Sequence, residues 1–304
     1  MNGKPFTQGT NKTRIRESAV DRLFLGGIYF FLCLILVSVL YPLIYIVSAS
    51  LSDPSAVTSG QVWLFPVNPT LEGYTTVFKN PQIIQGFSNS LFYAVVGTLI
   101  SVSITVMLAY PLSRRTFYGR SIIIILLVFT MIFDGGLIPT YLVVKNLHFI
   151  DTIWALLLPS ALAVFQVIIA RSFFQTTIPD ELAEASEIDG CSDFRFFWSI
   201  VLPLSKPILA VLVLMYAVAK WNMYFDALIY LKSEQLYPLQ LILRSVLILN
   251  ADPNGDVMQL LKAQGLRELM KYSLIVISSL PVLIIYPFVQ KYFVKGVLIG
   301  SLKG

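Results

Sequence analysis

The chain is short of charge: only 13% of its 304 residues are Asp, Glu, Lys or Arg. A soluble domain carries about 25% charged residues, so an ordinary water-covered surface is excluded. The apolar residues make up 56% of the chain and are gathered into long runs. Residues 23–52 and 80–113 contain no charged side chain, and about 20 such residues let a helix cross a bilayer. The sequence therefore predicts an all-α, polytopic membrane protein.

Cysteine and histidine are nearly absent, with two cysteines and one histidine in the whole chain. Cys33 and Cys191 cannot form a disulfide framework or a zinc site, and His148 alone cannot build a histidine metal centre. A Ser-His-Asp triad with a spare base is disfavoured for the same reason. The Gly-x-x-x-x-Gly-Lys-[Ser/Thr] loop that binds nucleotide phosphates is also missing. We therefore expect a chain that is not an enzyme and holds no metal or cofactor of its own.

Hydropathy predicts six membrane spans, at about 23–50, 88–112, 121–144, 152–172, 207–231 and 272–292. The first apolar run is too long for a signal peptide, so we expect it to be retained. Of the 22 Lys and Arg residues, 14 lie on the side of the N-terminus and seven on the opposite side. Basic residues mark the cytoplasmic side, so we expect both termini in the cytoplasm, with tails over 1–22 and 293–304. The net charge of +5 then reflects membrane topology and not nucleic-acid binding.

The predicted cytoplasmic loop 178–206 carries a pattern of two short helices. Pro179 followed by two acids is typical of a first helical turn, and Leu182, Ala185 and Ile188 would share one face. Gly190 is typical of the left-handed residue that ends a helix. A second helix is expected from Ser192, with Phe194, Phe197, Trp198 and Val201 on one face. Pro203 and Pro207 are expected to break the chain before the fifth span.

This loop could rest on lipid head groups or bind another protein. It contains six acids, whereas an anionic membrane surface attracts Lys and Arg. An acidic helix with an apolar face is better suited to a groove on a protein. The composition therefore favours a protein partner.

The spacing of residues in this loop resembles that of a known family. Glu184-Ala185-Ser186, Gly190, Ile200 and Leu202-Pro203 resemble the EAA loop of permease subunits in binding-protein-dependent, ATP-driven importers. Ser186 stands where that family usually has a second alanine. The segment 292–296 resembles the tail of maltose-type carbohydrate permeases. Segments 133–140 and 236–241 are similar to the branch of that class that handles complex oligosaccharides and uronate-containing fragments.

The resemblance implies a bacterial cell-membrane importer with several partners. These are a second homologous permease, two ATPase subunits that would bind ATP and Mg, and an extracytoplasmic solute-binding protein that delivers an oligosaccharide. In the family, the residue matching Gly190 lies at the bend of the coupling helix, and the one matching Glu184 faces the ATPase. The implied coupling residues are Glu184, Ala185, Ser186, Asp189, Gly190, Ile200, Leu202 and Pro203.

Charged residues within spans usually face a bundle interior or an aqueous path. Asn222 and Asp226 are expected one turn apart on one helix face. Sugars offer hydroxyls to polar side chains and flat faces to aromatic rings. The candidate substrate-path residues are Asp134, Lys220, Trp221, Asn222, Tyr224 and Asp226. The same residues could instead bind neighbouring helices or the partner permease.

An ion-coupled secondary transporter of a small solute is the alternative to an ATP-driven permease. Such transporters often contain inverted repeats with buried acids in paired halves, and the sequence has no visible repeat. A membrane-embedded enzyme would need an acid-base or metal set that the sequence does not offer. The favoured hypothesis is a permease subunit that transmits conformational change and leaves ATP hydrolysis to a partner.

Overall fold

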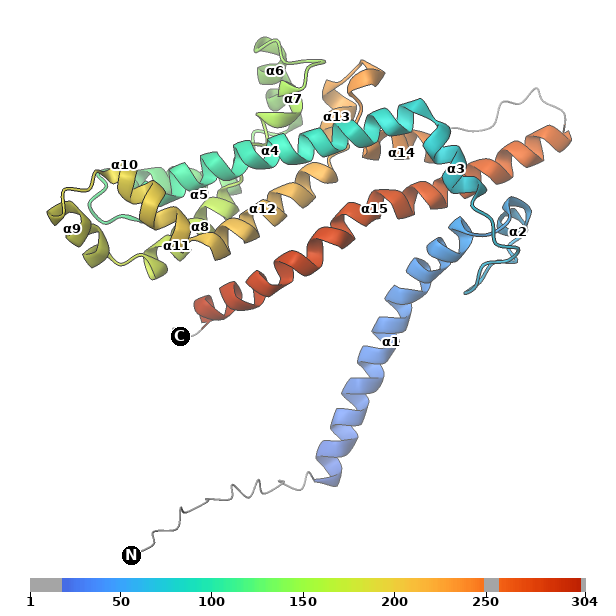
Figure 1. Ribbon diagram of the computed structural model, residues 1–304, viewed down its shortest axis with the longest axis horizontal. Helices are drawn as coiled ribbons and strands as arrows, with labels where there is room; N and C mark the ends of the chain where they lie inside the picture. The colour runs from blue at the N-terminus through green and yellow to red at the C-terminus, as the bar shows by residue number, and fades with distance from the viewer. Residues whose placement is uncertain (1–17, 249–256, 302–304) are drawn as a thin grey trace, which may run out of the picture.

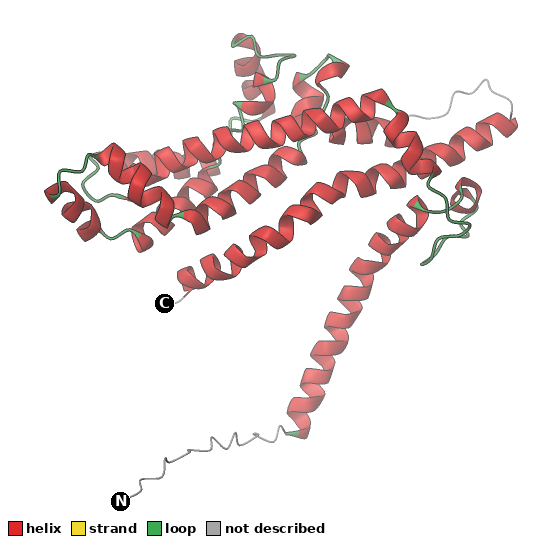
Figure 2. Cartoon of the chain, in the orientation of Figure 1, coloured by secondary structure: helices red, strands yellow, loops and turns green. Residues whose placement is uncertain are grey.

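The computed structural model describes residues 18–248 and 257–301, and in these two ranges every regular element is a helix (Figure 2). The predicted tails are described only from residue 18 and as far as residue 301. The helix α15, Val257–Ser301, continues past the predicted end of the last span at residue 292. Part of the segment expected as a C-terminal tail is therefore helical.

Helix α1, Ala19–Ser50, leans away from the other helices and meets α15 (Figure 1). A capping box at Ser18 starts it: the Ser18 hydroxyl accepts the Val20 N–H, and the Asp21 carboxylate accepts the Ser18 N–H. Most of its side chains as far as residue 47 are exposed, Leu25, Tyr45 and Ile46 are half-buried, and only the last three residues are buried. Such an apolar, uncovered helix requires a lipid or protein environment.

The centre of the molecule is α4, Pro81–Ser113, which packs against α12, Lys206–Trp221, and α8, Val164–Thr177 (Figure 1). On its other side α12 packs against α15. Two short helices, α2, Pro54–Thr58, and α3, Glu72–Lys79, also pack on α15. The core between α4, α8 and α12 is apolar and includes Val106, Ala109, Leu112, Phe174 and Leu212.

Short helices gather at the two ends of this bundle (Figure 1). Near the first half of α4 lie α7, Trp154–Leu157, and α14, Leu239–Ile248. The same end carries α6, Leu137–Asn146, and α13, Phe225–Tyr230. At the far end of α4 lie α5, Arg120–Ile132, and the loop helices α9, Asp180–Ile188, α10, Asp193–Phe196, and α11, Leu202–Leu204.

Three helices are long and apolar enough to cross a membrane: Ala19–Ser50, Pro81–Ser113 and Gln264–Pro287. Two bent pairs raise this number to five, namely α5 with α6, bent by 116°, and Asp193–Leu204 with α12, bent by 79°. The protein is therefore a polytopic membrane protein with three to five candidate spanning helices in the described residues.

Three of the predicted spans are not continuous helices. The span expected at 121–144 breaks before Gly136, whose φ of +83° an L-residue rarely adopts. The span expected at 152–172 is divided between α7 and α8 by the segment 158–163. The span expected at 207–231 stops at Trp221 and restarts as α13. Hydropathy registers apolar content, and these breaks fall within apolar sequence.

Candidate functional site

The predicted loop 178–206, called the acidic loop from here on, forms the two expected helices around Gly190. This residue has a φ of +73°, and its N–H donates to the Glu187 carbonyl at 2.9 Å. The next N–H, from Cys191, reaches back to the Ser186 carbonyl at 2.9 Å. This pair of bonds is the Schellman arrangement that ends a helix at a left-handed residue. The prediction of a glycine bend is confirmed.

The second loop helix differs from its prediction in where it ends. Ser192 caps α10 through its hydroxyl, which accepts the Arg195 N–H at 3.4 Å. The chain then widens into a π-turn at Phe197–Val201 and continues directly into α11, which contains Pro203. A proline ring clashes with the carbonyl four residues earlier in a regular α-helix, and the wider turn relieves that clash. The chain therefore bends at Ser205 and not at Pro203.

The buried face of α9 is also different from the predicted one. Leu182 and Ala183 pack against the core, and Ser186 is half-buried beside them. Ala185 is exposed and Ile188 is 87% exposed. The helix contacts the bundle through neighbouring positions i, i+1 and i+4, so a strict three-residue spacing did not identify the buried face.

Arg114, at the end of α4, holds the start of this loop. Its guanidinium donates to the Asp180 carboxylate at 3.3 Å and to the Ile178 carbonyl at 3.4 Å. It also lies over the rings of Tyr110 and Phe196, at 5.0 and 5.9 Å from their centroids. Phe196 is buried in the core. The loop is thus fixed to the bundle by an ion pair, a carbonyl contact and aromatic contacts.

The predicted coupling residues fall into two groups. Glu184, Ala185, Asp189 and Gly190 are exposed at the tip of the loop. In the second group Ile200 and Leu202 pack against the core, Ser186 is half-buried and Pro203 is exposed. The first group can contact a partner, and Ile200 and Leu202 attach the loop to the bundle.

A cavity of about 410 Å³ lies between α12, α13 and the start of α8. We call it the polar cavity because seven of the residues that line it are polar, although most of its lining surface is apolar. Four predicted path residues line it: Lys220, Asn222, Tyr224 and Asp226. Its other polar residues are Ser160, Gln166 and Tyr216, which the sequence analysis missed. They were detectable only as polar side chains within or beside predicted spans.

Asn222 and Asp226 come together for a reason other than the predicted one. The helix α12 ends at Trp221 and α13 begins at Phe225, so the two residues do not share one helix face. The break between them lets both line the same cavity. The Asn222 amide also donates to the Val218 carbonyl at 2.9 Å.

The two charged groups of this cavity differ in their contacts. The Lys220 side chain is buried and donates to the Ser160 hydroxyl at 2.7 Å and to the Leu156 and Leu157 carbonyls at 3.1 and 3.5 Å. Asp226 is half-buried. Among the described residues, no ion pair joins these two groups and no hydrogen bond is made to the Asp226 carboxylate.

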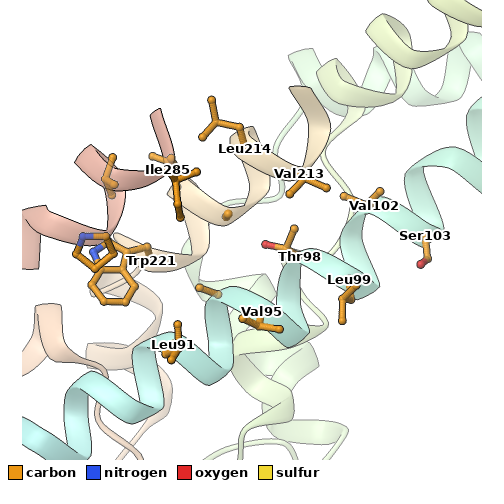
Figure 3. Close-up of a pocket in the computed structure, with 15 residues that line it drawn as sticks. Leu91, Val95, Thr98, Leu99, Val102, Ser103, Val213, Leu214, Trp221 and Ile285 are labelled. Atoms are coloured by element: carbon orange, nitrogen blue, oxygen red, sulfur yellow. The ribbon is translucent and has the colours of Figure 1, made fainter. Parts of the chain in front are cut away.

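Trp221 and Asp134 lie away from the polar cavity. Trp221 is among apolar side chains of α4, α12 and α15 that line a separate cavity of about 370 Å³ (Figure 3). Its indole N–H donates to the Ser278 carbonyl at 2.9 Å. Asp134 is exposed in the turn between α5 and α6, where its carboxylate accepts the Gly136 N–H at 3.0 Å. Within the described ranges, no group of three His, Cys, Asp or Glu side chains could hold a metal ion.

Known proteins of similar sequence and structure identify the family of this chain. The chain is 44% identical to Protein LplC of Bacillus subtilis over 93% of each sequence. It is 41% identical to the polygalacturonan/rhamnogalacturonan transport system permease protein YtcP of the same species, over 93% of this chain and 99% of that protein. It also resembles a chain in the crystal structure of a bacterial ABC transporter involved in the import of the acidic polysaccharide alginate. The TM-score is 0.85 at 34% identity, covering 92% of this chain and 99% of that chain.

A family match covers most of the bundle. Residues 108–299 match the family described as binding-protein-dependent transport system inner membrane component. The matched range includes the loop around Gly190 and the residues of the polar cavity. The chain belongs to this family and is therefore a permease subunit of an ABC transporter, which is not itself an enzyme.

Proposed function

We propose that this chain is one permease subunit of an ATP-driven importer of oligosaccharides. The names of its relatives support this proposal, because one transports polygalacturonan and rhamnogalacturonan and another belongs to an alginate importer. The polar cavity beside Asp226 supports it as well, since its carboxylate and amide groups can bind sugar hydroxyls.

The proposed assembly contains a second homologous permease, two ATPase subunits that bind ATP and Mg, and an extracytoplasmic solute-binding protein. In the proposed topology six segments cross a bacterial cell membrane and both termini are cytoplasmic. The distribution of Lys and Arg supports this orientation. The grouping of α9, α10 and α11 with the far end of α4 also supports it, because all of these would then face the cytoplasm (Figure 1).

The proposed coupling element is the tip of the acidic loop, with Glu184, Ala185, Asp189 and Gly190 toward the ATPase. One observation carries the proposal: the exposed acidic end of α9 belongs to a loop that Arg114 and Phe196 attach to the bundle. This attachment allows a push on the loop to move α12. The tip would be supported by the remaining predicted coupling residues, which are Ser186, Ile200, Leu202 and Pro203.

A charge reversal tests the coupling role. Glu184→Lys should leave membrane insertion intact but lose the ATPase subunit on purification, or lose ATP hydrolysis stimulated by the loaded binding protein. Removing one partner of a buried pair at the interface costs about 3–5 kcal/mol. Glu72→Lys, on the exposed face of α3, is the matched control. Stimulated hydrolysis at the wild-type rate in Glu184→Lys would remove this loop from the mechanism.

The proposed sugar path runs through the cavity lined by Asn222, Tyr224 and Asp226, with Lys220 in its wall. We expect Asp226→Leu and Asn222→Leu to reduce sugar uptake several-fold while the ATPase still assembles. Asp134→Leu removes a carboxylate outside the cavity and is the control. Trp221 is left out of the path because it lines the apolar cavity instead. Wild-type uptake by both cavity variants would contradict the path.

A further inference from the structure

Lys220 is a buried ammonium group whose hydrogens are already used within the chain. The residue is 4% exposed, and an ammonium has three hydrogens and accepts no bond. The three acceptors within reach are the Ser160 hydroxyl and the carbonyls of Leu156 and Leu157. These three contacts leave no hydrogen for a substrate in this conformation.

The acceptors are at the end of a helix. Leu156 and Leu157 are the last two residues of α7, and the last carbonyls of a helix have no partner within it. Ser160 lies three residues further along, in the segment that connects α7 to α8. Lys220 therefore caps α7 and fixes the connection that forms one wall of the polar cavity.

Helix α4 also shapes the space that the Lys220 side chain occupies. A β-carbon on Gly97 of α4 would lie 3.1–3.2 Å from three carbons of the Lys220 stem. Glycine at this position thus leaves the space through which the stem passes. Three elements meet at one amine: α4 gives the space, α12 supplies the side chain and α7 provides the acceptors.

Lys220 is one residue from the end of α12, and α12 begins directly after the bend at Ser205. The 16 residues of α12 form a rod about 24 Å long at 1.5 Å per residue. One end of the rod is attached to the acidic loop and the other end is tied by Lys220 to α7. A displacement of the loop therefore has a continuous path of contacts along α12 to the wall of the cavity.

We infer that Lys220 is a positioning residue that joins α12 to the segment 156–160, so that movement at the coupling loop changes the shape of the polar cavity. This inference rests on the proposed function and refines it. It assigns direct contact with the sugar to Asp226 and Asn222. Lys220 acts on the sugar only through α7 and Ser160.

The test follows the cavity wall directly with a thiol probe. In the complete transporter with its ATPase, Cys33 and Cys191 are changed to serine and Ala163→Cys is introduced, because Ala163 lines the cavity in the segment that connects α7 to α8. The rate of labelling by a membrane-impermeant maleimide is measured in proteoliposomes, with and without ATP and vanadate. With Lys220 unchanged, we expect the labelling rate to change several-fold when nucleotide binds.

Lys220→Met should abolish this nucleotide-dependent change while ATPase assembly is retained. Lys220→Arg should preserve part of it, because a guanidinium can still donate to the same carbonyls. Lys145→Met, at an exposed position in the last turn of α6, is the matched control and should behave as wild type. Ser160→Ala should weaken the change, and adding it to Lys220→Met should have no further effect, since both remove the same contact.

The possible failures are distinct. If labelling responds to nucleotide in Lys220→Met as in the control, Lys220 does not transmit the movement and the inference is wrong. If Lys220→Met does not assemble, a normal response in Ser160→Ala would also overturn it. If the wild-type chain itself shows no ATPase association, the proposed function fails first.

Discussion

At the scale of single residues, the turn at Gly190 depends on its backbone. A side chain at this position would meet no heavy atom within 4 Å, whereas the φ of +73° is one that L-residues rarely adopt. The constraint is therefore conformational and not steric. An L-residue in the left-handed region costs roughly 1–2 kcal/mol, and a β-branched residue is a clear outlier there.

This conformational constraint predicts that two substitutions at Gly190 differ in their effect on ATPase binding. Gly190→Val should lose the ATPase subunit on purification, because the turn cannot keep its shape. Gly190→Asn should retain most of it, since asparagine tolerates positive φ. The measurement is the amount of ATPase that co-purifies per permease. Equal loss in both variants would indicate that the ATPase packs against the glycine itself.

Asp151 is a second residue whose position was decided by the fold. It has a φ of +60°, and its carboxylate accepts the Ser233 hydroxyl at 2.6 Å and the N–H groups of Ser233 and Lys232, both at 2.8 Å. The hydrogen bonds from Ser233 and then from Lys232 lower the pKa of Asp151. They tie the turn before α7 to the chain that leaves α13.

The lowered pKa predicts a pH dependence. The unfolded value is about 3.9, so the stabilisation by Asp151 is fully present above about pH 4. It is lost as the pH falls through the lower folded pKa, where the carboxylate becomes protonated. Thermal unfolding of the solubilised protein should therefore depend less on pH in this acidic range in Asp151→Asn than in wild type. Ser233→Ala should shift in the same direction, and an unchanged pH profile in both would contradict the assignment.

At the scale of elements, Arg114 attaches the start of the loop helices to the end of α4. Its side chain is 12% exposed, whereas that of the neighbouring Arg115 is 83% exposed, at 3.7 Å from the same carboxylate. A hydrogen bond to a charged group contributes about 1.5–3 kcal/mol, and an exposed ion pair about 0–1 kcal/mol. The two arginines should therefore differ in effect.

We expect Arg114→Met to loosen the loop and Arg115→Met to leave it nearly unchanged. The half-buried Cys191 is a natural reporter, with Cys33→Ser as background. Its labelling by a maleimide should be several-fold faster in Arg114→Met than in Arg115→Met. Equal labelling rates would show that Phe196 alone holds the loop.

Elements were predicted well where a single helix carries its own signal. The runs 23–52 and 80–113 gave α1 and α4, because lack of charge over 30 residues is a local property. Breaks inside apolar sequence were missed. The bend of 116° between α5 and α6 occurs at Gly135-Gly136, which the sequence offers as a weak point without giving a direction for the chain.

At the scale of the whole molecule, the proposed topology gives a direct test. Because 14 of the 22 basic residues would lie inside, reporter fusions after residue 245 and after residue 304 should report opposite compartments. Phosphatase activity would mark the outside and fluorescence of a cytoplasmic reporter the inside. The same compartment for both fusions would exclude the six-span topology, in which one span separates residue 245 from residue 304.

From the sequence alone one can deduce a helical membrane protein with a two-helix acidic loop and a glycine bend. Charge content, apolar run length and helix-end chemistry are local and are written in adjacent residues. Which polar residues share a cavity depends instead on the packing of the helices. Asp226 and Asn222 line the same cavity because α12 breaks after Trp221. Trp221 donates to the Ser278 carbonyl on α15, and Lys220 donates to Ser160, which is 60 residues away in the chain. Such contacts depend on how helices distant in the chain pack together, and this packing cannot be deduced from local periodicity.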